Sequence, residues 1–223
     1  ESGRPIHRIW CTTEIRSSPR FLQLLKDAKS VGVLVEEVSW ARLGHVTRGG
    51  VHQGIALQTA ASETFDLKTL IEACRAMEEE PVLIALDGLT DPQNLGAIVR
   101  SAEALGAHGM VLPQRRSAGI TGSVAKVAAG ALEHLPVARV VNLNRSLEEL
   151  KEAGYTVIGL AGEGDKTVNE ISFDGPLVLV IGSEGKGLSL LTRRHCEILL
   201  RIPLRGVTSS LNASAATSVV LYE

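Results

Sequence analysis

Small and polar residues gather in four segments that each follow or continue an apolar run. They are DGLTDPQNLGAIVR (87–100), GLAGEGDKT (159–167), GSEGKGLS (182–189) and IPLRGVTSSLNASAAT (202–217). One such segment by itself is usually only a turn. Four of them together favour a ligand site, because glycine lets the backbone approach a ligand closely.

The last segment holds more small polar residues than a helix start requires. A simpler explanation is that Ser209 or Ser210 caps a helix, since a hydroxyl accepts hydrogen bonds from the free N–H groups of a first turn. That helix would carry Leu211, Ala215, Val219 and Tyr222. Capping needs one side chain, whereas the segment offers Thr208, Ser209, Ser210, Asn212, Ser214 and Thr217. The excess indicates backbone that lies close to a ligand.

The glycine spacing does not match either of two common nucleotide-binding motifs. In GLAGEGDKT, Asp165 separates the second glycine from Lys166, so the phosphate-loop pattern G-x-x-x-x-G-K-[ST] is missed by one residue. The glycines at 182, 185 and 187 do not match the G-x-G-x-x-G pattern of dinucleotide-binding turns. A ligand that is neutral or cationic at its reactive centre therefore suits these loops better than a triphosphate or a dinucleotide.

The first segment carries a possible phosphate-binding arginine. If a helix begins near Asn94, Gly96 and Arg100 lie one turn apart, and the glycine removes bulk beside the guanidinium. The guanidinium would then offer a bidentate donor to a phosphate or a ribose. Alternatively, Asn94 is only the helix cap and Arg100 pairs with Glu103 on the surface. The residues alone leave both interpretations open.

The elements that would position these loops form a regular pattern after residue 80. Six aliphatic runs, VLIALD, GMVLP, VARVV, TVIGL, LVLVI and ILLRI, alternate with helical stretches near 94–106, 121–134, 146–153 and 211–222. This pattern predicts an α/β fold with a parallel sheet covered on both faces. Ligands of such sheets bind beyond the carboxyl ends of the strands, where the four segments lie.

The part before residue 80 predicts a separate small α/β module. It contains a helical PRFLQLLKDAKS, strand-like VGVLVEEVS and GIALQTA, and a glycine-rich loop, GHVTRGGVHQG, between those strands. The polar SETFDLKTLIEACRAMEEE then predicts a connecting helix. We therefore expect a first domain over 1–62, a linker over 63–80 and a main domain over 81–223.

Composition limits the possible partners. The net charge is −2, but residues 1–62 carry +3 and the remainder −5, so only a local nucleic-acid site is favoured. An aromatic content of 3% argues against a sheet that stacks several bases. Three cysteines without metal-like or disulfide-like spacing favour a reducing cytoplasm, and no metal is expected. No apolar run approaches the roughly 20 residues of a membrane span.

Three segments resemble a known family in order and spacing. NLGAIVR, LVLVIGSEGKGLS and IPLRGVTSSLNASAA are similar to the three motifs of the SpoU (TrmH-like) branch of the SPOUT RNA 2'-O-ribose methyltransferases, and the resemblance covers residues 81–223. The small module, which ends in GGVHQGIAL, resembles the L30e-like RNA-binding domain of the RlmB-type enzymes that methylate a guanosine of 23S rRNA. Family members usually start earlier and end in a longer helix than SVVLYE, so we expect that the sequence lacks both ends.

The resemblance implies a fold, a cofactor and an assembly. The main domain would form a deep trefoil knot that binds S-adenosylmethionine, and small residues would be needed where backbone crosses backbone and cofactor. The chain would form a homodimer with its sites near the subunit interface. The implied cofactor-binding residues are Leu160, Ala161, Gly162, Gly182, Ile202 and Leu211.

The resemblance also implies the reaction, an attack of a ribose 2'-hydroxyl on the sulfonium methyl group. The implied polar site is Asn94, Arg100, Glu184, Asn212 and Ser214. We expect Arg100 to bind a phosphate of the target nucleotide and the other four to fix the geometry. The family's arginine has been discussed as a general base, but a guanidinium with a pKa above 12 is a poor base.

RNA contacts are also expected in the small module. The candidates are Arg48, His52 and Gln53, although this loop could be an ordinary polar turn. Selection could instead come from Arg4, Arg8, Arg16 or Arg20.

The leading hypothesis is thus an enzyme that methylates 23S rRNA. The alternatives are a tRNA 2'-O-methyltransferase and a non-catalytic RNA-binding or ribosome-assembly factor with the same fold. Cofactor binding without methyl transfer would favour the last of these.

Overall fold

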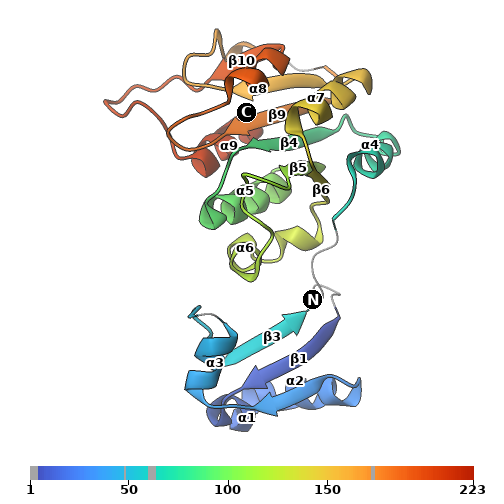
Figure 1. The fold of residues 1–223 in the computed structure, drawn as a ribbon, viewed down its shortest axis with the longest axis vertical. Helices are drawn as coiled ribbons and strands as arrows, with labels where there is room; N and C mark the ends of the chain where they lie inside the picture. Colours follow the sequence, from blue (N-terminus) through green and yellow to red (C-terminus); the bar gives the residue numbers. More distant parts are fainter. Residues whose placement is uncertain (1–4, 48, 60–63, 172–173) are drawn as a thin grey trace. The chain divides into compact units, whose positions relative to one another are not determined.

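The computed structural model describes residues 5–47, 49–59, 64–171 and 174–223 (Figure 1). The chain divides into two compact units, Glu1–Ala61 and Ser62–Glu223. Within the described residues, no helix is long and apolar enough to cross a membrane.

The first unit is a three-stranded sheet with helices. Its elements are β1 (Ile6–Cys11), α1 (Thr13–Ser17), α2 (Pro19–Ser30), β2 (Leu34–Glu37), α3 (Trp40–Val46) and β3 (Ile55–Thr59). The strand order is β2-β1-β3, with β2 parallel and β3 antiparallel to β1. Ile9 and Cys11 of β1 pack with Leu25 of α2 in its core.

Two features of the first unit differ from the sequence expectation. The predicted helix and two strands are confirmed as α2, β2 and β3, but the central strand β1 was not anticipated. Helix α3 also occupies the first part of the expected loop GHVTRGGVHQG, with Ser39 as its N-cap. A helix of seven residues is too short to show a clear apolar period.

The second unit is built on a seven-stranded sheet in the order β6-β5-β4-β9-β7-β10-β8. All neighbouring strands are parallel. The strands are β4 (Val82–Asp87), β5 (Gly109–Pro113), β6 (Val137–Val140), β7 (Thr156–Leu160), β8 (Lys166–Thr167), β9 (Leu177–Gly182) and β10 (Ile198–Arg201). The expectation of a parallel sheet from six aliphatic runs is confirmed.

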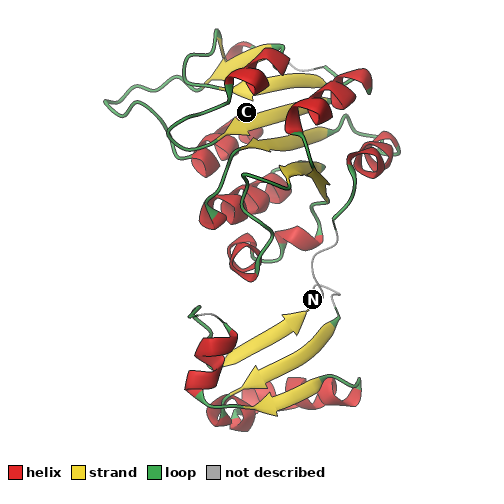
Figure 2. Ribbon diagram, in the orientation of Figure 1, coloured by secondary structure: helices red, strands yellow, loops and turns green. Residues whose placement is uncertain are grey.

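Helices cover both faces of this sheet (Figure 2). The elements between and after the strands are α4 (Leu67–Arg75), α5 (Pro92–Ala104), α6 (Gly122–Ala128), η1 (Ala131–Glu133), α7 (Leu143–Glu152), η2 (Val168–Glu170), α8 (Leu190–His195) and α9 (Ala213–Tyr222). On β4, Ile84 and Leu86 face the core beneath α5, α6 and α9, whereas Leu83 and Ala85 face the core beneath α4 and α7. This burial on both faces explains why the strands read as continuous apolar runs.

The predicted connecting helix is α4, and it belongs to the packed body of the second unit. Its N-cap Asp66 accepts a hydrogen bond from the backbone N–H of Thr69. Leu70 and Cys74 are buried in the same core as the strand residues Leu83 and Val111. The helix therefore covers the sheet and does not run free between the units.

Candidate active site

A cavity of about 480 Å³ lies at the carboxyl edge of the sheet. Its walls come from the loops that follow β7, β9 and β10. All six residues that the resemblance assigned to the cofactor line it: Leu160, Ala161, Gly162, Gly182, Ile202 and Leu211. The structure thus brings together three segments that are separated by about 20 residues each in the chain.

Gly182 ends β9 at a point where no side chain fits. A Cβ atom there would lie 2.2 Å from the carbonyl carbon of Gly187 and 2.4 Å from the backbone nitrogen of Leu188. The approach arises because residues 183–187 fold back tightly, with Gly187 N donating to Ser183 O at 2.8 Å. Gly185 and Gly187 adopt φ of +78° and +63°, the left-handed region that glycine tolerates. The glycines of GSEGKG therefore build a turn that carries Glu184.

Glu184 is the centre of a polar cluster at this edge. Its Oε1 accepts hydrogen bonds from Nδ2 of Asn94 at 2.7 Å and from Nδ2 of Asn212 at 2.6 Å. Nδ2 of Asn212 also donates to Oδ1 of Asn94 at 2.9 Å, and Oγ of Ser214 donates to Oδ1 of Asn212 at 2.6 Å. Four of the five predicted polar residues thus form one network. Glu184 and Asn212 also line the cavity, which places the network beside it.

The start of α5 holds Asn94 in place. Asp91 is the N-cap, and its carboxylate accepts from the backbone N–H groups of Gln93 and Asn94 at 3.1 Å each. Pro92 occupies the first helical position, where the fixed φ of proline matches that of the helix. The alternative in which Asn94 is the cap is therefore wrong. The buried Asn94 side chain is free to contact Glu184 instead.

Arg100 lies outside this network. It is exposed on α5, and its side chain makes no hydrogen bond or ion pair with any other described residue, Glu103 included. The proposed reason for Gly96 was also wrong. A Cβ atom at Gly96 would lie 2.6 Å from Cβ of Val127 and 2.9 Å from the carbonyl oxygen of Val124, so the glycine allows α5 and α6 to pack closely.

Asn212, and neither Ser209 nor Ser210, caps α9. Its Oδ1 accepts from the backbone N–H of Ser214 at 2.9 Å and of Ala215 at 3.4 Å. Ser209 and Ser210 line the cavity. The simple capping explanation for the serines is therefore wrong, and their position agrees with a ligand site.

The cavity rim holds an ion pair that sequence reasoning missed. NH1 of Arg193 on α8 contacts Oε1 of Glu163, and both residues line the cavity. A hydrogen bond from its own backbone, followed by the Arg193 contact, holds the pKa of the Glu163 carboxyl below its usual range. No motif surrounds Arg193 in the sequence, so only the fold could reveal this pair.

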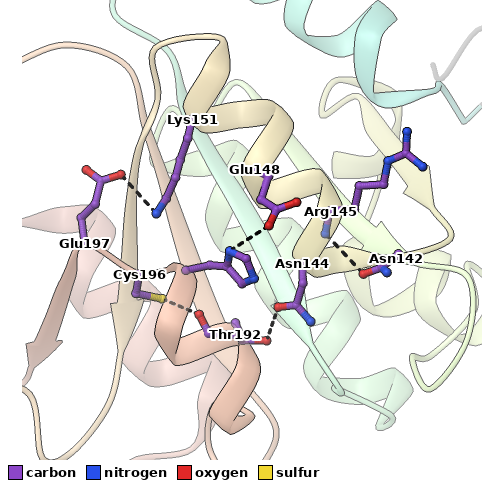
Figure 3. Close-up of polar contacts among 9 residues, drawn as sticks. Asn142, Asn144, Arg145, Glu148, Lys151, Thr192, Cys196 and Glu197 are labelled. Atoms are coloured by element: carbon purple, nitrogen blue, oxygen red, sulfur yellow. Dashed lines mark hydrogen bonds and ion pairs between the residues drawn. The ribbon is translucent and has the colours of Figure 1, made fainter.

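Polar contacts join α8, the helix after the turn that carries Glu184, to β4 and α7. Helix α8 follows that turn directly, and the backbone N–H of its cap Ser189 donates to Oδ2 of Asp87 at 2.7 Å. Figure 3 shows Oγ1 of Thr192 donating to Oδ1 of Asn144 across the two helices at 3.2 Å. Sγ of Cys196 donates to the carbonyl of Thr192, and burial raises the pKa of this thiol to about 11. The Asp87 contact therefore holds α8 to the end of β4, and the Asn144 contact holds it to α7.

The candidate RNA contacts of the first unit are only partly described. Arg4 and Arg48 lie outside the described residues. His52 accepts a hydrogen bond at Nδ1 from the backbone N–H of Gly54 at 3.2 Å, and its ring lies 4.7 Å from that of Trp40. Gln53 is exposed at a left-handed φ of +48°.

The other basic candidates of this unit make local contacts. Arg8 and Arg16 pair with Glu36 and Glu37, at 3.8 Å and 2.6 Å. The Arg20 guanidinium lies 5.7 Å from the ring of Phe21. Elsewhere in the described ranges, no group of three or more His, Cys, Asp or Glu residues could hold a metal ion.

Comparison with known proteins assigns both parts of the chain. Residues 81–222 match the model of the SpoU rRNA Methylase family, and residues 1–65 match that of RNA 2'-O ribose methyltransferase substrate binding. A tRNA/rRNA methyltransferase of Synechocystis sp. is 51% identical over the whole chain, which spans 58% of that protein's length. The 23S rRNA (guanosine-2'-O-)-methyltransferase RlmB of Pseudomonas aeruginosa is 42% identical, over 98% of this chain and 87% of its own.

Solved structures agree with this assignment. The AdoMet-bound rRNA methyltransferase of Sinorhizobium meliloti superimposes with a TM-score of 0.78 and 26% identity, over 99% of this chain and 80% of its own. The expected SPOUT fold class is thereby confirmed. With its three motifs joined through Asn94, Glu184 and Asn212, and with residues 1–65 and 81–222 matched by the two family models, the chain belongs to the SpoU rRNA methylase family of RNA 2'-O-methyltransferases.

Proposed function

We propose that this chain binds S-adenosylmethionine in the cavity and transfers its methyl group to a ribose 2'-hydroxyl of RNA. The observation that carries the proposal is the position of Glu184 and Asn212, which line the cavity and also belong to the polar network. A ligand in the cavity and an RNA ribose at the network would therefore be neighbours. Methyl transfer requires that proximity.

The cavity walls fit the proposed cofactor. Leu160, Ile202 and Leu211 offer apolar surface to a flat adenine ring. Gly182 lets the backbone of Gly187 and Leu188 pack against the end of β9, and this packing shapes one wall of the cavity. When bound, S-adenosylmethionine supplies a methyl group that its sulfonium centre already activates. The protein then has to align the acceptor and provide a route for its proton.

The polar residues divide into two roles in this proposal. The network of Asn94, Glu184, Asn212 and Ser214 holds the acceptor ribose beside the cavity. Arg100, whose guanidinium has no partner within the described part of the chain, binds a phosphate of the target nucleotide and orients the 2'-hydroxyl. A guanidinium keeps its proton at any working pH, so alignment suits Arg100 better than general-base catalysis.

The proposed substrate is a guanosine of 23S rRNA. Support comes from the relative in Pseudomonas aeruginosa, whose name gives that substrate. The Synechocystis relative is named for tRNA or rRNA, so a tRNA target is the alternative within the same chemistry. We further propose that residues 1–62 bind RNA through Arg48, His52 and Gln53 and that 81–223 form the catalytic domain. Residues 63–80 would join the two, with α4 packed on the sheet of the catalytic domain.

Parallel assays on two RNAs test this function. The chain is incubated with labelled S-adenosylmethionine and either unmodified large-subunit rRNA or unmodified tRNA, and cofactor affinity is measured by calorimetry. We expect labelling of the rRNA. The Glu184→Ala variant should lose labelling, whereas Glu149→Ala, on the far face of the sheet, should keep it. Labelling of tRNA alone would overturn the rRNA assignment, and cofactor binding without any labelling would favour the non-catalytic alternative.

A further inference from the structure

The loop that follows β5 carries two arginines that no part of the proposed site uses. Arg115 and Arg116 lie side by side in the sequence, and both are exposed. Neither makes a hydrogen bond or an ion pair with the part of the chain that the structure describes. By contrast, Arg139 on the neighbouring strand uses NH2 to contact the carbonyl of Gln114 at 3.5 Å.

The backbone of this loop is fixed at both ends. Gln114 N donates to the carbonyl of Val140 at 2.8 Å, and Ala118 N donates to the carbonyl of Leu89 at 2.8 Å. Ala118 and Leu89 are both buried in the core beneath α5 and α6. The two arginines are therefore presented by an anchored segment, and their side chains alone are free.

The backbone of Arg116 adopts a conformation that arginine rarely takes. Its φ of +56° lies in the left-handed region, where glycine or asparagine is the usual choice. A turn of this shape would form at lower cost with glycine. A left-handed arginine that the turn does not require favours a role for its side chain, since strained residues are often found at functional sites.

The strand order places this loop beside the proposed acceptor site. At the carboxyl edge, the strand order β5-β4-β9-β7-β10 sets the order of the loops that follow these strands. The cavity lies in the loops after β9, β7 and β10, and Asn94 follows β4. The arginine loop follows β5, and its bond to Leu89 joins it directly to the loop that leads to Asn94. Along the edge, the order is cavity, polar network, arginine pair.

We propose that Arg115 and Arg116 form a phosphate-binding site for the RNA strand next to the modified ribose, an inference that rests on the proposed function. Two unpaired guanidinium groups offer bidentate donors to phosphodiester oxygens. They recognise the RNA backbone and carry no base specificity. They are positioning residues, because they hold the strand and do not contact the reacting atoms.

Salt-dependent binding separates this role from a structural one. Affinity for an unmodified large-subunit rRNA fragment is measured over a KCl series for the wild type, Arg116→Gly, Arg116→Lys and the Arg115→Ala/Arg116→Gly double variant. Glycine suits the left-handed φ and lysine adds no strain beyond that of arginine, so all three variants should fold and bind S-adenosylmethionine as the wild type does. Each lost phosphate contact should reduce the slope of log K against log [salt] by about 0.7 to 1. Arg116→Lys should keep most of the slope.

The control for the single variant Arg116→Gly is Arg75→Ala, which removes one exposed charge from the last turn of α4, just before β4 begins and so at the other edge of the sheet. It should leave the slope unchanged. In the methylation assay the double variant should raise KM for RNA while kcat stays close to that of the wild type. The proposal is wrong if the double variant and Arg75→Ala have the same slope while the wild type still methylates RNA. A wild type that binds no RNA would overturn the proposed function together with this site.

Discussion

Glu184 shows how one residue in a short turn can organise a site. Its Oε1 joins side chains that lie 90 and 28 residues away in the chain. The motif resemblance predicted that Asn94, Glu184, Asn212 and Ser214 belong together. It could not predict which atoms pair, because that depends on the turn at 183–187 and on the cap at Asp91.

Arg100→Lys tests the need for a planar guanidinium. Lysine keeps the charge but loses the bidentate fork, so we expect turnover to fall by roughly 10- to 100-fold, which corresponds to about 1.5–3 kcal/mol for a hydrogen bond to a charged group. Cofactor affinity should not change. Arg145→Lys, exposed on α7, serves as the control. Turnover near that of the wild type would contradict the proposed role.

Gly182→Ala and Gly162→Ala form a matched pair at the same cavity. The added Cβ at 182 would collide with backbone at 2.2 Å, whereas nothing lies within 4 Å of a Cβ at 162. The first substitution should therefore abolish cofactor binding and lower the melting temperature, and the second should leave melting temperature unchanged. Calorimetry and thermal unfolding measure both effects. Equal behaviour of the two variants would argue against the close backbone approach as the reason for Gly182.

At the scale of elements, strands were easier to predict than short helices. Runs such as VLIALD are buried on both faces, so their aliphatic residues follow one another without interruption and predict a strand. Helices α3 and α8 contain only seven and six residues and show no complete apolar period. Strand β1, IHRIWC, was missed because His7 and Arg8 interrupt its apolar residues, so it shows neither a continuous apolar run nor a strict alternation. A knot, which the resemblance implies, cannot be deduced from periodicity at all, since the pattern does not record how the chain threads.

Gly96→Ala tests the packing of α5 on α6. The added methyl would overlap with Val127 and with the backbone of Val124, so we expect a loss of about 1–3 kcal/mol in the free energy of unfolding. Gly122→Ala is the control, because it lies at the start of α6 with open space around the new Cβ. Urea unfolding of both variants gives the comparison. A Gly96→Ala variant as stable as Gly122→Ala would show that the helices can separate without cost.

At the scale of the whole molecule, the expected homodimer remains a prediction. The outer face of α9 presents Ala215, Val219 and Tyr222 at helical spacing, and Tyr222 is 81% exposed. An exposed apolar stripe of this kind suits a protein interface. We expect the chain to be dimeric by light scattering and Val219→Glu/Tyr222→Glu to shift it towards monomer. The control Leu24→Glu, at an exposed position of the first unit, should leave the dimer intact. A wild-type chain that is monomeric would contradict this prediction.

The central claim is that the product carries its new methyl group on a ribose oxygen. The most direct test labels unmodified large-subunit rRNA with methyl-labelled S-adenosylmethionine and then hydrolyses the RNA in alkali. A 2'-O-methyl group blocks cleavage of the adjacent phosphodiester, so we predict that the label appears in an alkali-resistant dinucleotide derived from one guanosine. Label recovered only in mononucleotides would place the methyl group on a base. That result would contradict the proposed roles of Glu184, Asn212 and Arg100 in aligning a ribose 2'-hydroxyl.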